Sequence, residues 1–278
     1  MNTAKNIPVG SIPNVKHIVA VASGKGGVGK STTTVNLALA MASIGIKVGI
    51  LDADIYGPSV PKMLGVDGAR PEVVDNKFML PIIAHGIPII SMANLVTEKT
   101  PMVWRGPMAS GALLQLITQT QWPELDCLLI DMPPGTGDIQ LTLSQKIAVN
   151  GAVIVTTPQD IALLDARKAI EMFRKVEVPV LGVVENMAVH VCSECGHTEH
   201  VFGEAGGERI ASEYQVELLG ALPLDIQIRQ QADAGVPLDN INPGSVAVEC
   251  YKEIALALQN KLLELCKLAP PSIIISDD

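Results

Sequence analysis

A glycine-rich run directly after an apolar segment constrains the fold of this chain more than any other feature. Residues 18–22 are apolar and largely β-branched, and they lead into Gly24-Lys25-Gly26-Gly27-Val28-Gly29-Lys30-Ser31-Thr32. This run fits G-x-x-x-x-G-K-[ST], in which backbone N–H groups wrap nucleotide phosphates, the lysine after the last glycine reaches the β/γ oxygens and the hydroxyl binds Mg²⁺. A helix-forming stretch at 33–43 follows, so the phosphates would lie at a helix N-terminus. The sequence therefore predicts a nucleotide site over the whole run, with Ser31 as the magnesium ligand.

A second lysine lies inside this loop. A plain P-loop does not need Lys25, so it indicates another positive charge directed at a phosphate; the alternative is a solvated loop lysine. With Lys25 included, the loop resembles K-G-G-x-x-K-[ST], the pattern of the deviant Walker A family, which includes septum- and chromosome-positioning ATPases, the arsenical-pump ATPase and the nitrogenase iron protein. In that family the first lysine crosses a dimer interface. The resemblance implies that Lys25 stabilises charge on the partner's nucleotide, as an arginine finger does.

Length and composition favour one large α/β domain. The chain has 278 residues, of which 48% are hydrophobic and only 3% aromatic, so its core would consist of Val, Ile, Leu and Ala. Such a core suits a doubly wound, mostly parallel sheet with helices on both faces, and no repeat indicates a tandem arrangement. We expect an irregular lead-in at 1–16, a P-loop ATPase domain at 17–268 and a C-terminal tail at 269–278.

Apolar runs alternate with helical patterns along the domain, as in doubly wound sheets. Residues 65–88 are rich in Pro and charge and are expected to form an excursion, and 245–267 should form a long helix. The expected strands are 18–22, 47–51, 87–91, 127–131, 152–156, 180–185 and 218–222.

Charge, hydropathy and cysteine content exclude several classes of protein. The net charge of −9 counts against nonspecific nucleic-acid binding, which depends on clustered Lys and Arg. No apolar stretch approaches the roughly 20 residues of a membrane span, and the N-terminus has no signal-peptide pattern. We therefore expect a cytoplasmic protein that binds neither nucleic acid nor membrane. Five cysteines without a secretion signal indicate reduced thiols or metal ligands.

Three aspartates lie at or just after the ends of expected strands, where α/β sheets bind ligands. Asp131 ends a buried strand, the usual place of a carboxylate beside the Mg²⁺ of a P-loop enzyme. Resemblance to the family's D-x-D motif implies that Asp54 orients or activates the attacking water and that Asp52 supports the metal shell. The alternative is that Asp52 and Asp54 only form a turn. The expected catalytic set is thus Lys25, Lys30, Asp52, Asp54 and Asp131.

Two further segments are candidates for contacts with the nucleotide. The loop at 132–138 contains Gly135 and Gly137, which can bring N–H groups close to a γ-phosphate, and we expect a switch there. Asn186, Pro223 and Asp225 match the positions where the family holds the adenine base. The alternative for these three is a role in turns.

A cysteine pair is the second decisive motif. Cys192 and Cys195 form a C-x-x-C-G turn that directs two thiolates at one metal, in a loop expected at 190–203. Two ligands are too few, so the site would need His197, His200, another cysteine or a second subunit. Three interpretations follow: a shared iron–sulfur cluster, a structural zinc knuckle and a dithiol redox pair. The other cysteines, Cys127, Cys250 and Cys266, are expected to be small core residues.

Several motifs occur together along the chain: the P-loop, Asp52-Ala-Asp-Ile-Tyr-Gly-Pro-Ser59, Trp104-Arg105-Gly106-Pro107, Asp131-Met-Pro-Pro-Gly-Thr-Gly-Asp138, Glu185-Asn186-Met187 and the C-x-x-C-G segment that ends in Phe202-Gly203. Together they resemble the Mrp/ApbC family of ATP-dependent iron–sulfur cluster carriers over nearly the whole chain. The resemblance implies ATP and Mg²⁺ as cofactors, and a [4Fe–4S] cluster held by the C-x-x-C of two subunits in a homodimer. It also implies partners among apo iron–sulfur proteins and a cluster-assembly scaffold. Compared with many bacterial members, we expect no small accessory domain ahead of the P-loop. The rivals are a positioning ATPase with a zinc knuckle and a nitrogenase-type reductase.

Overall fold

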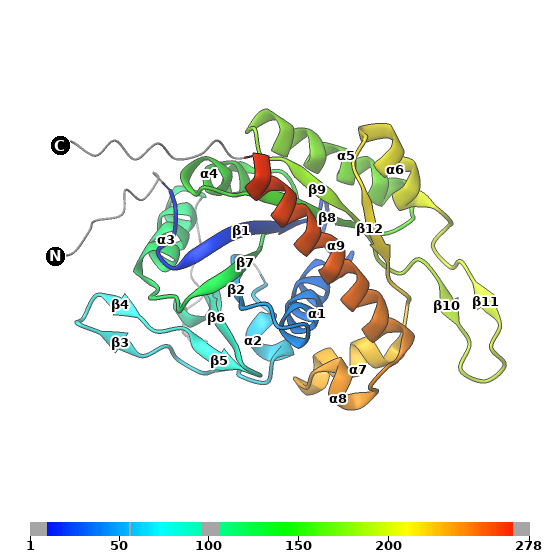
Figure 1. Ribbon diagram of the computed structural model, residues 1–278, viewed down its shortest axis with the longest axis horizontal. Coiled ribbons are helices and arrows are strands. Elements are labelled where there is room, and N and C mark those ends of the chain that lie inside the picture. Colours follow the sequence, from blue (N-terminus) through cyan, green and yellow to red (C-terminus); the bar gives the residue numbers. More distant parts are fainter. Residues whose placement is uncertain (1–9, 56, 96–105, 269–278) are drawn as a thin grey trace.

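An eight-stranded, mostly parallel sheet forms the centre of the protein (Figure 1). The computed structural model describes residues 10–55, 57–95 and 106–268. The strand order is β12-β9-β8-β1-β7-β2-β6-β5, and only the β5–β6 pair is antiparallel. The strands of this sheet are β1 (Val15–Ala22), β2 (Val48–Asp52), β5 (Ile82–Ala84), β6 (Ile87–Ser91), β7 (Leu125–Asp131), β8 (Gly151–Thr156), β9 (Val180–Glu185) and β12 (Leu218–Ala221).

Helices cover both faces of the sheet, and the long α9 crosses the face that α1 also covers (Figure 1). No helix in the part of the chain that the structure describes is long and apolar enough to cross a membrane. The helices are α1 (Lys30–Ser43), α2 (Val60–Met63), α3 (Gly106–Gln119), α4 (Asp138–Lys146), α5 (Asp160–Lys175), α6 (Gly206–Tyr214), α7 (Ile226–Ala234), α8 (Leu238–Ile241) and α9 (Val246–Leu268), with a 3₁₀ turn, η1 (Met92–Leu95).

Two hydrophobic cores lie on the two faces of the sheet. Successive side chains of a strand point to opposite faces. On β1, Val19 and Val21 accordingly belong to a core with side chains of α1 and α9, whereas Ile18 and Ala20 belong to a core with side chains of α3 and α5. Both cores consist mainly of Val, Ile, Leu and Ala. The expected doubly wound α/β fold is confirmed.

The strand register brings the functional loops to one edge of the sheet. Val21 of β1 and Asp52 of β2 both pair with Asp131 of β7, and Asp52 also pairs with Ser91 of β6. The chain moves from β1 toward β2 on one side and toward β8 and β9 on the other, so the winding direction reverses beside β1. Ligands of doubly wound proteins bind at the carboxyl edge next to such a reversal.

Some boundaries differ from the sequence-based expectation. Strand β1 begins at Val15, inside the expected lead-in, and α1 begins at Lys30, before the expected 33–43. The expected excursion at 65–88 contains the hairpin of β3 (Val73–Val74) and β4 (Phe78–Met79), followed by β5. Tight turns with positive φ, such as 50° at Asn76, form these hairpins, and short turns of this kind lack a strong apolar pattern. Residues 1–9, Trp104-Arg105 and the tail at 269–278 lie outside the described residues.

Candidate functional site

The P-loop connects β1 to α1 and has the backbone that a phosphate site requires. Gly27 and Gly29 have φ of 84° and 80°, a region that favours glycine. A Cβ at Gly26 or Gly27 would meet no atom within 4 Å, so these two positions face open space. A Cβ at Gly29 would instead lie 2.2 Å from Nδ2 of Asn186, and one at Gly24 would lie 2.0 Å from the carbonyl oxygen of Asp165. The loop therefore needs glycine for close packing on one side and is open on the other.

A cavity of about 370 Å³ lies over this open side. Its walls include the P-loop residues Lys25, Lys30, Ser31 and Thr32. Other walls come from Asp54 after β2, from α2, from Pro134 after β7 and from α7. The cavity thus brings together loops that follow β1, β2 and β7, at the position predicted for the phosphates.

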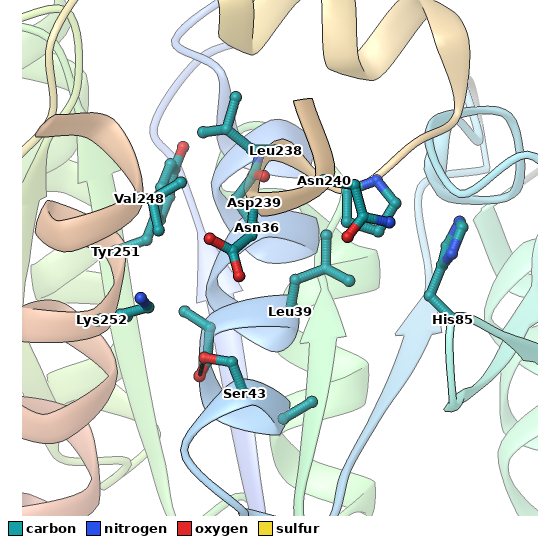
Figure 2. Close-up of a pocket in the computed structure, with 13 residues that line it drawn as sticks. Asn36, Leu39, Ser43, His85, Leu238, Asp239, Asn240, Val248, Tyr251 and Lys252 are labelled. Atoms are coloured by element: carbon teal, nitrogen blue, oxygen red, sulfur yellow. Dashed lines mark hydrogen bonds between the residues drawn. The ribbon is translucent and has the colours of Figure 1, made fainter. Parts of the chain in front are cut away.

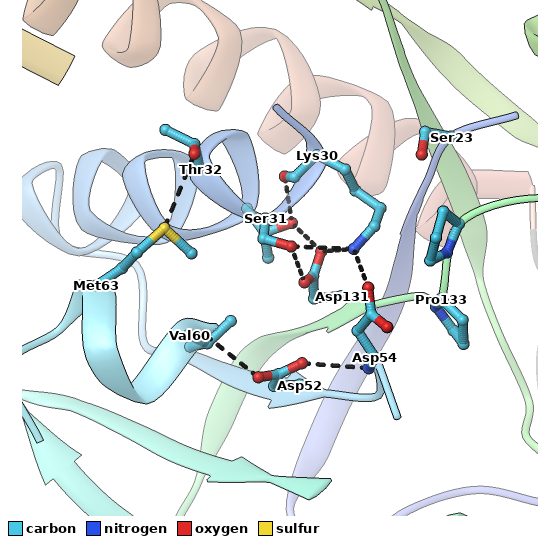
Figure 3. A network of polar contacts seen from close by, with 12 residues as sticks. Ser23, Lys30, Ser31, Thr32, Asp52, Asp54, Val60, Met63, Asp131 and Pro133 are labelled. Atoms are coloured by element: carbon cyan, nitrogen blue, oxygen red, sulfur yellow. Dashed lines mark hydrogen bonds and ion pairs between the residues drawn. The ribbon is translucent and has the colours of Figure 1, made fainter. Parts of the chain in front are cut away.

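Lys30, Ser31 and Asp131 form a buried polar network at the floor of this cavity (Figure 3). Lys30 Nζ lies 2.7 Å from Asp131 Oδ1 and 3.9 Å from Asp54 Oδ2. Ser31 Oγ donates to Asp131 Oδ2 at 2.6 Å, and Thr34 Oγ1 donates to Asp131 Oδ1 at 2.9 Å. Since a buried charge needs a partner, Asp131 holds the Lys30 ammonium in place beneath the loop.

The two aspartates of the D-x-D motif have different surroundings. Asp52 is fully buried, and its Oδ2 accepts hydrogen bonds from Ser91 Oγ at 2.9 Å and from the Val60 N–H at 3.2 Å, while Oδ1 accepts from the Asp54 N–H at 3.2 Å. Burial, together with the nearby charge of Asp131, raises the pKa of Asp52 to about 7. Asp54 instead lines the cavity. Asp52 therefore holds the backbone of the loop from which Asp54 faces the cavity.

The expected switch loop is connected to the P-loop. Ser23 Oγ donates to the Lys25 carbonyl at 2.9 Å, and the Gly135 N–H donates to the Ser23 carbonyl at 3.0 Å. Gln140 Nε2 donates to the carbonyls of Pro133 and Pro134 at 2.9 and 3.0 Å. Lys25 itself is half-buried and lines the cavity. A movement of the loop after β7 would therefore be transmitted to the backbone of Lys25 through the hydrogen bonds of Ser23.

Two of the three residues expected at the adenine, Asn186 and Asp225, form hydrogen bonds with the backbone through their side chains. Asn186 Nδ2 donates to the Val28 carbonyl at 2.8 Å, and its Oδ1 accepts from the Met187 N–H at 3.0 Å. Asp225 caps α7, because its Oδ1 accepts from the Gln227 N–H at 2.8 Å. Pro223 is half-buried, two residues before Asp225. None of the three lines the cavity over the P-loop. The geometry thus gives Asn186 a role in holding the P-loop and Asp225 a role as a helix cap.

The cysteine pair lies at the end of a small hairpin, formed by β10 (His190–Val191) and β11 (Thr198–Glu199), which projects from the sheet (Figure 1). The Cys192 N–H donates to the His197 carbonyl and the Gly196 N–H to the Cys192 carbonyl, both at 2.9 Å. Cys192 is half-buried and Cys195 is exposed. Hydrogen bonds from the backbone N–H groups of Cys195 and Glu194 lower the pKa of the Cys192 thiol, which favours the thiolate that binds metals.

The candidate histidine ligands do not complete a metal site with this pair. His200 Nδ1 lies 2.9 Å from the Ala188 carbonyl oxygen, so that ring nitrogen has a backbone partner. No group of three or more His, Cys, Asp or Glu side chains that could hold a metal occurs among the described residues. A metal held by the thiolates of this exposed turn would need further ligands from outside these residues.

The other cysteines differ from this pair. Cys127 of β7 is buried, and burial raises the pKa of its thiol, which fits the expected core role. Cys250 is half-buried on α9. Cys266 lies on the last part of α9, and its side chain is outside the described residues.

Sequence reasoning missed several residues in and beneath the cavity. Thr34 does not line the cavity but donates to Asp131 from one helical turn after Lys30, so a hydroxyl on the same face could have been expected from the spacing of α1. Ser59, Lys62 and Asp233 do line the cavity. Ser59 ends the motif that begins at Asp52, whereas no motif of α2 or α7 predicts Lys62 or Asp233.

A second cavity, of about 440 Å³, lies between α1, α8, α9 and the β5–β6 turn (Figure 2). Leu39, His85, Leu238 and Tyr251 are among its lining residues. None of the predicted site residues lines it.

Comparisons with known proteins agree with these features. Residues 14–259 match the family model described as ParA, NUBPL iron-transfer P-loop NTPase. The chain is 65% identical over 88% of its length to an iron–sulfur cluster carrier protein of Pseudomonas fragi, covering 86% of that protein. It is 58% identical to the iron–sulfur cluster carrier protein of Escherichia coli K12, over 92% of this chain and 69% of that protein.

Solved structures show the same fold. A nucleotide-binding protein from Archaeoglobus fulgidus, in complex with ADP, superposes with a TM-score of 0.72 at 39% identity, covering 82% of this chain and 89% of that chain. The cell division ATPase MinD of Pyrococcus furiosus superposes with a TM-score of 0.65 at 23% identity, covering 88% and 99%, and shows the fold alone. The family match and the relatives confirm the resemblance to the Mrp/ApbC carriers, and the chain belongs to the ParA family of NUBPL-type iron-transfer P-loop NTPases.

Proposed function

We propose that this protein binds and hydrolyses ATP and carries a [4Fe–4S] cluster, held between two copies of the chain, which it transfers to apoproteins. The observation that carries the proposal is the placement of two sites. The P-loop follows β1 and the cysteine hairpin follows β9, so both leave the sheet at its carboxyl edge. Relatives named iron–sulfur cluster carrier proteins support the assignment of the cargo.

The nucleotide site has the chemistry that Mg-ATP needs. Ser31 Oγ and Asp131 Oδ2 lie 2.6 Å apart and are hard oxygen ligands of the kind that Mg²⁺ prefers. Bound Mg²⁺ would neutralise charge on the β- and γ-phosphates. Lys30 would exchange part of its interaction with Asp131 for the phosphates, and Asp54, which lines the cavity, would orient the attacking water. Asp52 would support this arrangement from below by holding the loop of Asp54.

The cargo site needs a second copy of the chain. A [4Fe–4S] cluster takes about four thiolates, and the hairpin supplies Cys192 and Cys195 only. Two hairpins facing each other would complete the set. In such a dimer Lys25, half-buried in the loop and lining the cavity, would contact the partner's nucleotide. Nucleotide state would then alter the contact between copies and thus the exposure of the cluster.

The remaining assignments follow from this scheme. Asn186, Pro223 and Asp225 would lie near the base, with Asn186 connecting it to the P-loop through Val28. The partners would be a scaffold that supplies the cluster and apo iron–sulfur proteins that receive it. The acidic balance of the chain gives no basis for nucleic-acid binding.

Anaerobic reconstitution tests the proposal. We expect about four iron and four sulfide per two chains, with the cluster absent from Cys192→Ser and Cys195→Ser and present in the matched control Cys250→Ser. Nucleotide binding should persist in all three variants, because the hairpin lies outside the cavity over the P-loop. One zinc per chain, retained by monomers, would favour the structural knuckle and contradict the carrier function.

A further inference from the structure

The cavity over the P-loop has three lysines in its walls. Lys25 and Lys30 come from the P-loop, and Lys62 comes from α2, the short helix that follows the loop of Asp54. Neither the P-loop motif nor the D-x-D motif includes Lys62. Its side chain is exposed to solvent, so it is free to move toward a ligand.

The three lysines differ in their ion pairs. Lys30 is neutralised by Asp131 at 2.7 Å and lies 3.9 Å from Asp54. Within the described residues, no ion pair includes Lys25 or Lys62. Two ammonium groups at the cavity, those of Lys25 and Lys62, thus stand outside any ion pair among the described residues, an arrangement that attracts an anion.

Asp233 of α7 also lines the cavity but does not offset Lys62. Its Oδ2 accepts a hydrogen bond from Arg229 Nη1 at 2.7 Å, one helical turn away. The carboxylate is thus already paired on the surface of its own helix. The lining side chains of Lys25, Lys30 and Lys62 therefore outnumber the carboxylates of Asp54 and Asp233, and the net charge of the lining is positive.

The backbone of α2 is held in place from several sides (Figure 3). The Val60 N–H donates to Asp52 Oδ2 at 3.2 Å, and Thr32 Oγ1 of the P-loop helix lies 3.8 Å from Met63 Sδ. On its other side α2 packs on α7: a Cβ at Gly235 would lie 2.5 Å from Gly65 Cα and 3.1 Å from the Lys62 carbonyl oxygen. The base of the Lys62 side chain is therefore fixed at the wall, and only its flexible stem moves.

We propose that Lys62 binds the polyphosphate of the nucleotide and is a third cation of the site. This inference rests on the proposed nucleotide-binding function. Lys62 lies on the helix that follows Asp54, so a phosphate held by Lys62 also fixes α2 and, through Val60 and Asp52, the loop of Asp54. Lys62 is thus both a binding residue and a positioning residue for that loop.

Titration of ATP into Lys62→Met, Lys62→Arg and the matched control Lys175→Met tests the inference. Methionine keeps the apolar stem and removes the charge, whereas arginine keeps the charge. Lys175 is also exposed, but it ends α5 at the opposite edge of the sheet. We expect Kd for ATP to rise about tenfold in Lys62→Met, the size of one hydrogen bond to a charged group. Lys62→Arg should stay within about threefold of the wild type, and Lys175→Met should be unchanged.

Salt dependence supplies a second readout. Loss of one cation from the site should make Kd of Lys62→Met less sensitive to salt than that of the wild type. Unchanged affinity in Lys62→Met, or equal losses in Lys62→Met and Lys62→Arg, would overturn the role of its charge. Lys30→Ala separates this failure from a failure of the site. If Lys30→Ala binds ATP normally, the proposed nucleotide site is wrong and the inference with it. If Lys30→Ala loses ATP binding but Lys62→Met does not, the proposed nucleotide site is supported and the role of Lys62 is wrong.

Discussion

Asp52→Asn should change the pH dependence of stability, because the Asp52 carboxyl group is fully buried and lies near the carboxylate of Asp131. Its pKa in the folded protein is raised from 3.8 to about 7, first by burial and then by the charge of Asp131. A carboxyl group whose folded pKa is raised keeps a proton that the unfolded chain has already lost. Its contribution to stability is therefore present at low pH, decreases as pH rises from about 4 to about 7, and is absent above that range.

The magnitude follows from these two pKa values. Between pH 5 and pH 8, the proton that folded Asp52 keeps after the unfolded chain has lost its own should lower the free energy of unfolding by roughly 2 to 3 kcal/mol. Asparagine does not titrate, so this pH-dependent part disappears in Asp52→Asn. The variant also has a constant penalty of about 1 to 3 kcal/mol, because its single amide oxygen cannot replace both acceptors of the Val60 and Asp54 N–H groups.

Urea unfolding of the nucleotide-free protein at pH 5 and pH 8 measures this difference. We expect Asp52→Asn to be less stable than the wild type at pH 5 and to gain about 2 to 3 kcal/mol relative to it at pH 8. Asp126→Asn is the matched control. A hydrogen bond from Lys16 lowers the pKa of Asp126, so the contribution of Asp126 to stability changes only in more acidic solution. The difference in free energy of unfolding between Asp126→Asn and the wild type should therefore be the same at both pH values. If the difference in free energy of unfolding between Asp52→Asn and the wild type is the same at pH 5 and pH 8, the reasoning is refuted.

Two further predictions concern turnover. Asp54→Asn should retain ATP binding but slow hydrolysis by about 10²-fold, the usual effect of losing a group that positions or activates water, and steady-state phosphate release with ITC of ATP checks it. Normal turnover in this variant would exclude the assigned role. Lys25→Ala should slow hydrolysis similarly if the lysine acts across the dimer. Heterodimers of Lys25→Ala with Lys30→Ala should then regain activity, because one composite site has both lysines; verified heterodimers without recovery would contradict action in trans.

Much of the fold could be predicted because its signals are local in the sequence. Apolar runs predicted the core strands, and β6 and β9 have the expected bounds, because buried parallel strands are nearly continuous in Val, Ile and Leu. The short strands β3, β4 and β5 were not predicted. Their pairing depends on turns with positive φ and on neighbours that a periodic pattern does not reveal.

Sequence by itself determined the chemical parts of the site. The glycines, Lys30 and Ser31 lie in one continuous motif, Asp131 ends a recognisable strand, and Cys192 and Cys195 share one turn. Each of these features needs only neighbours in sequence to be recognised, since its function follows from residue type and spacing within a few positions.

Tertiary structure alone decided how these parts are combined. It made Asp131 the acceptor of Lys30, Ser31 and Thr34 together, and it placed Asp52 beneath the loop of Asp54. The Asn186 amide, just after β9, donates a hydrogen bond to the Val28 carbonyl in the loop after β1. Helices α2 and α7 place Lys62 and Asp233 at the wall of the cavity. Apart from the contact between Asp52 and Asp54, these contacts join residues that lie far apart in the chain. Only the strand order and the packing of helices on the sheet bring such residues together, because spacing along one segment carries no information about its distant neighbours.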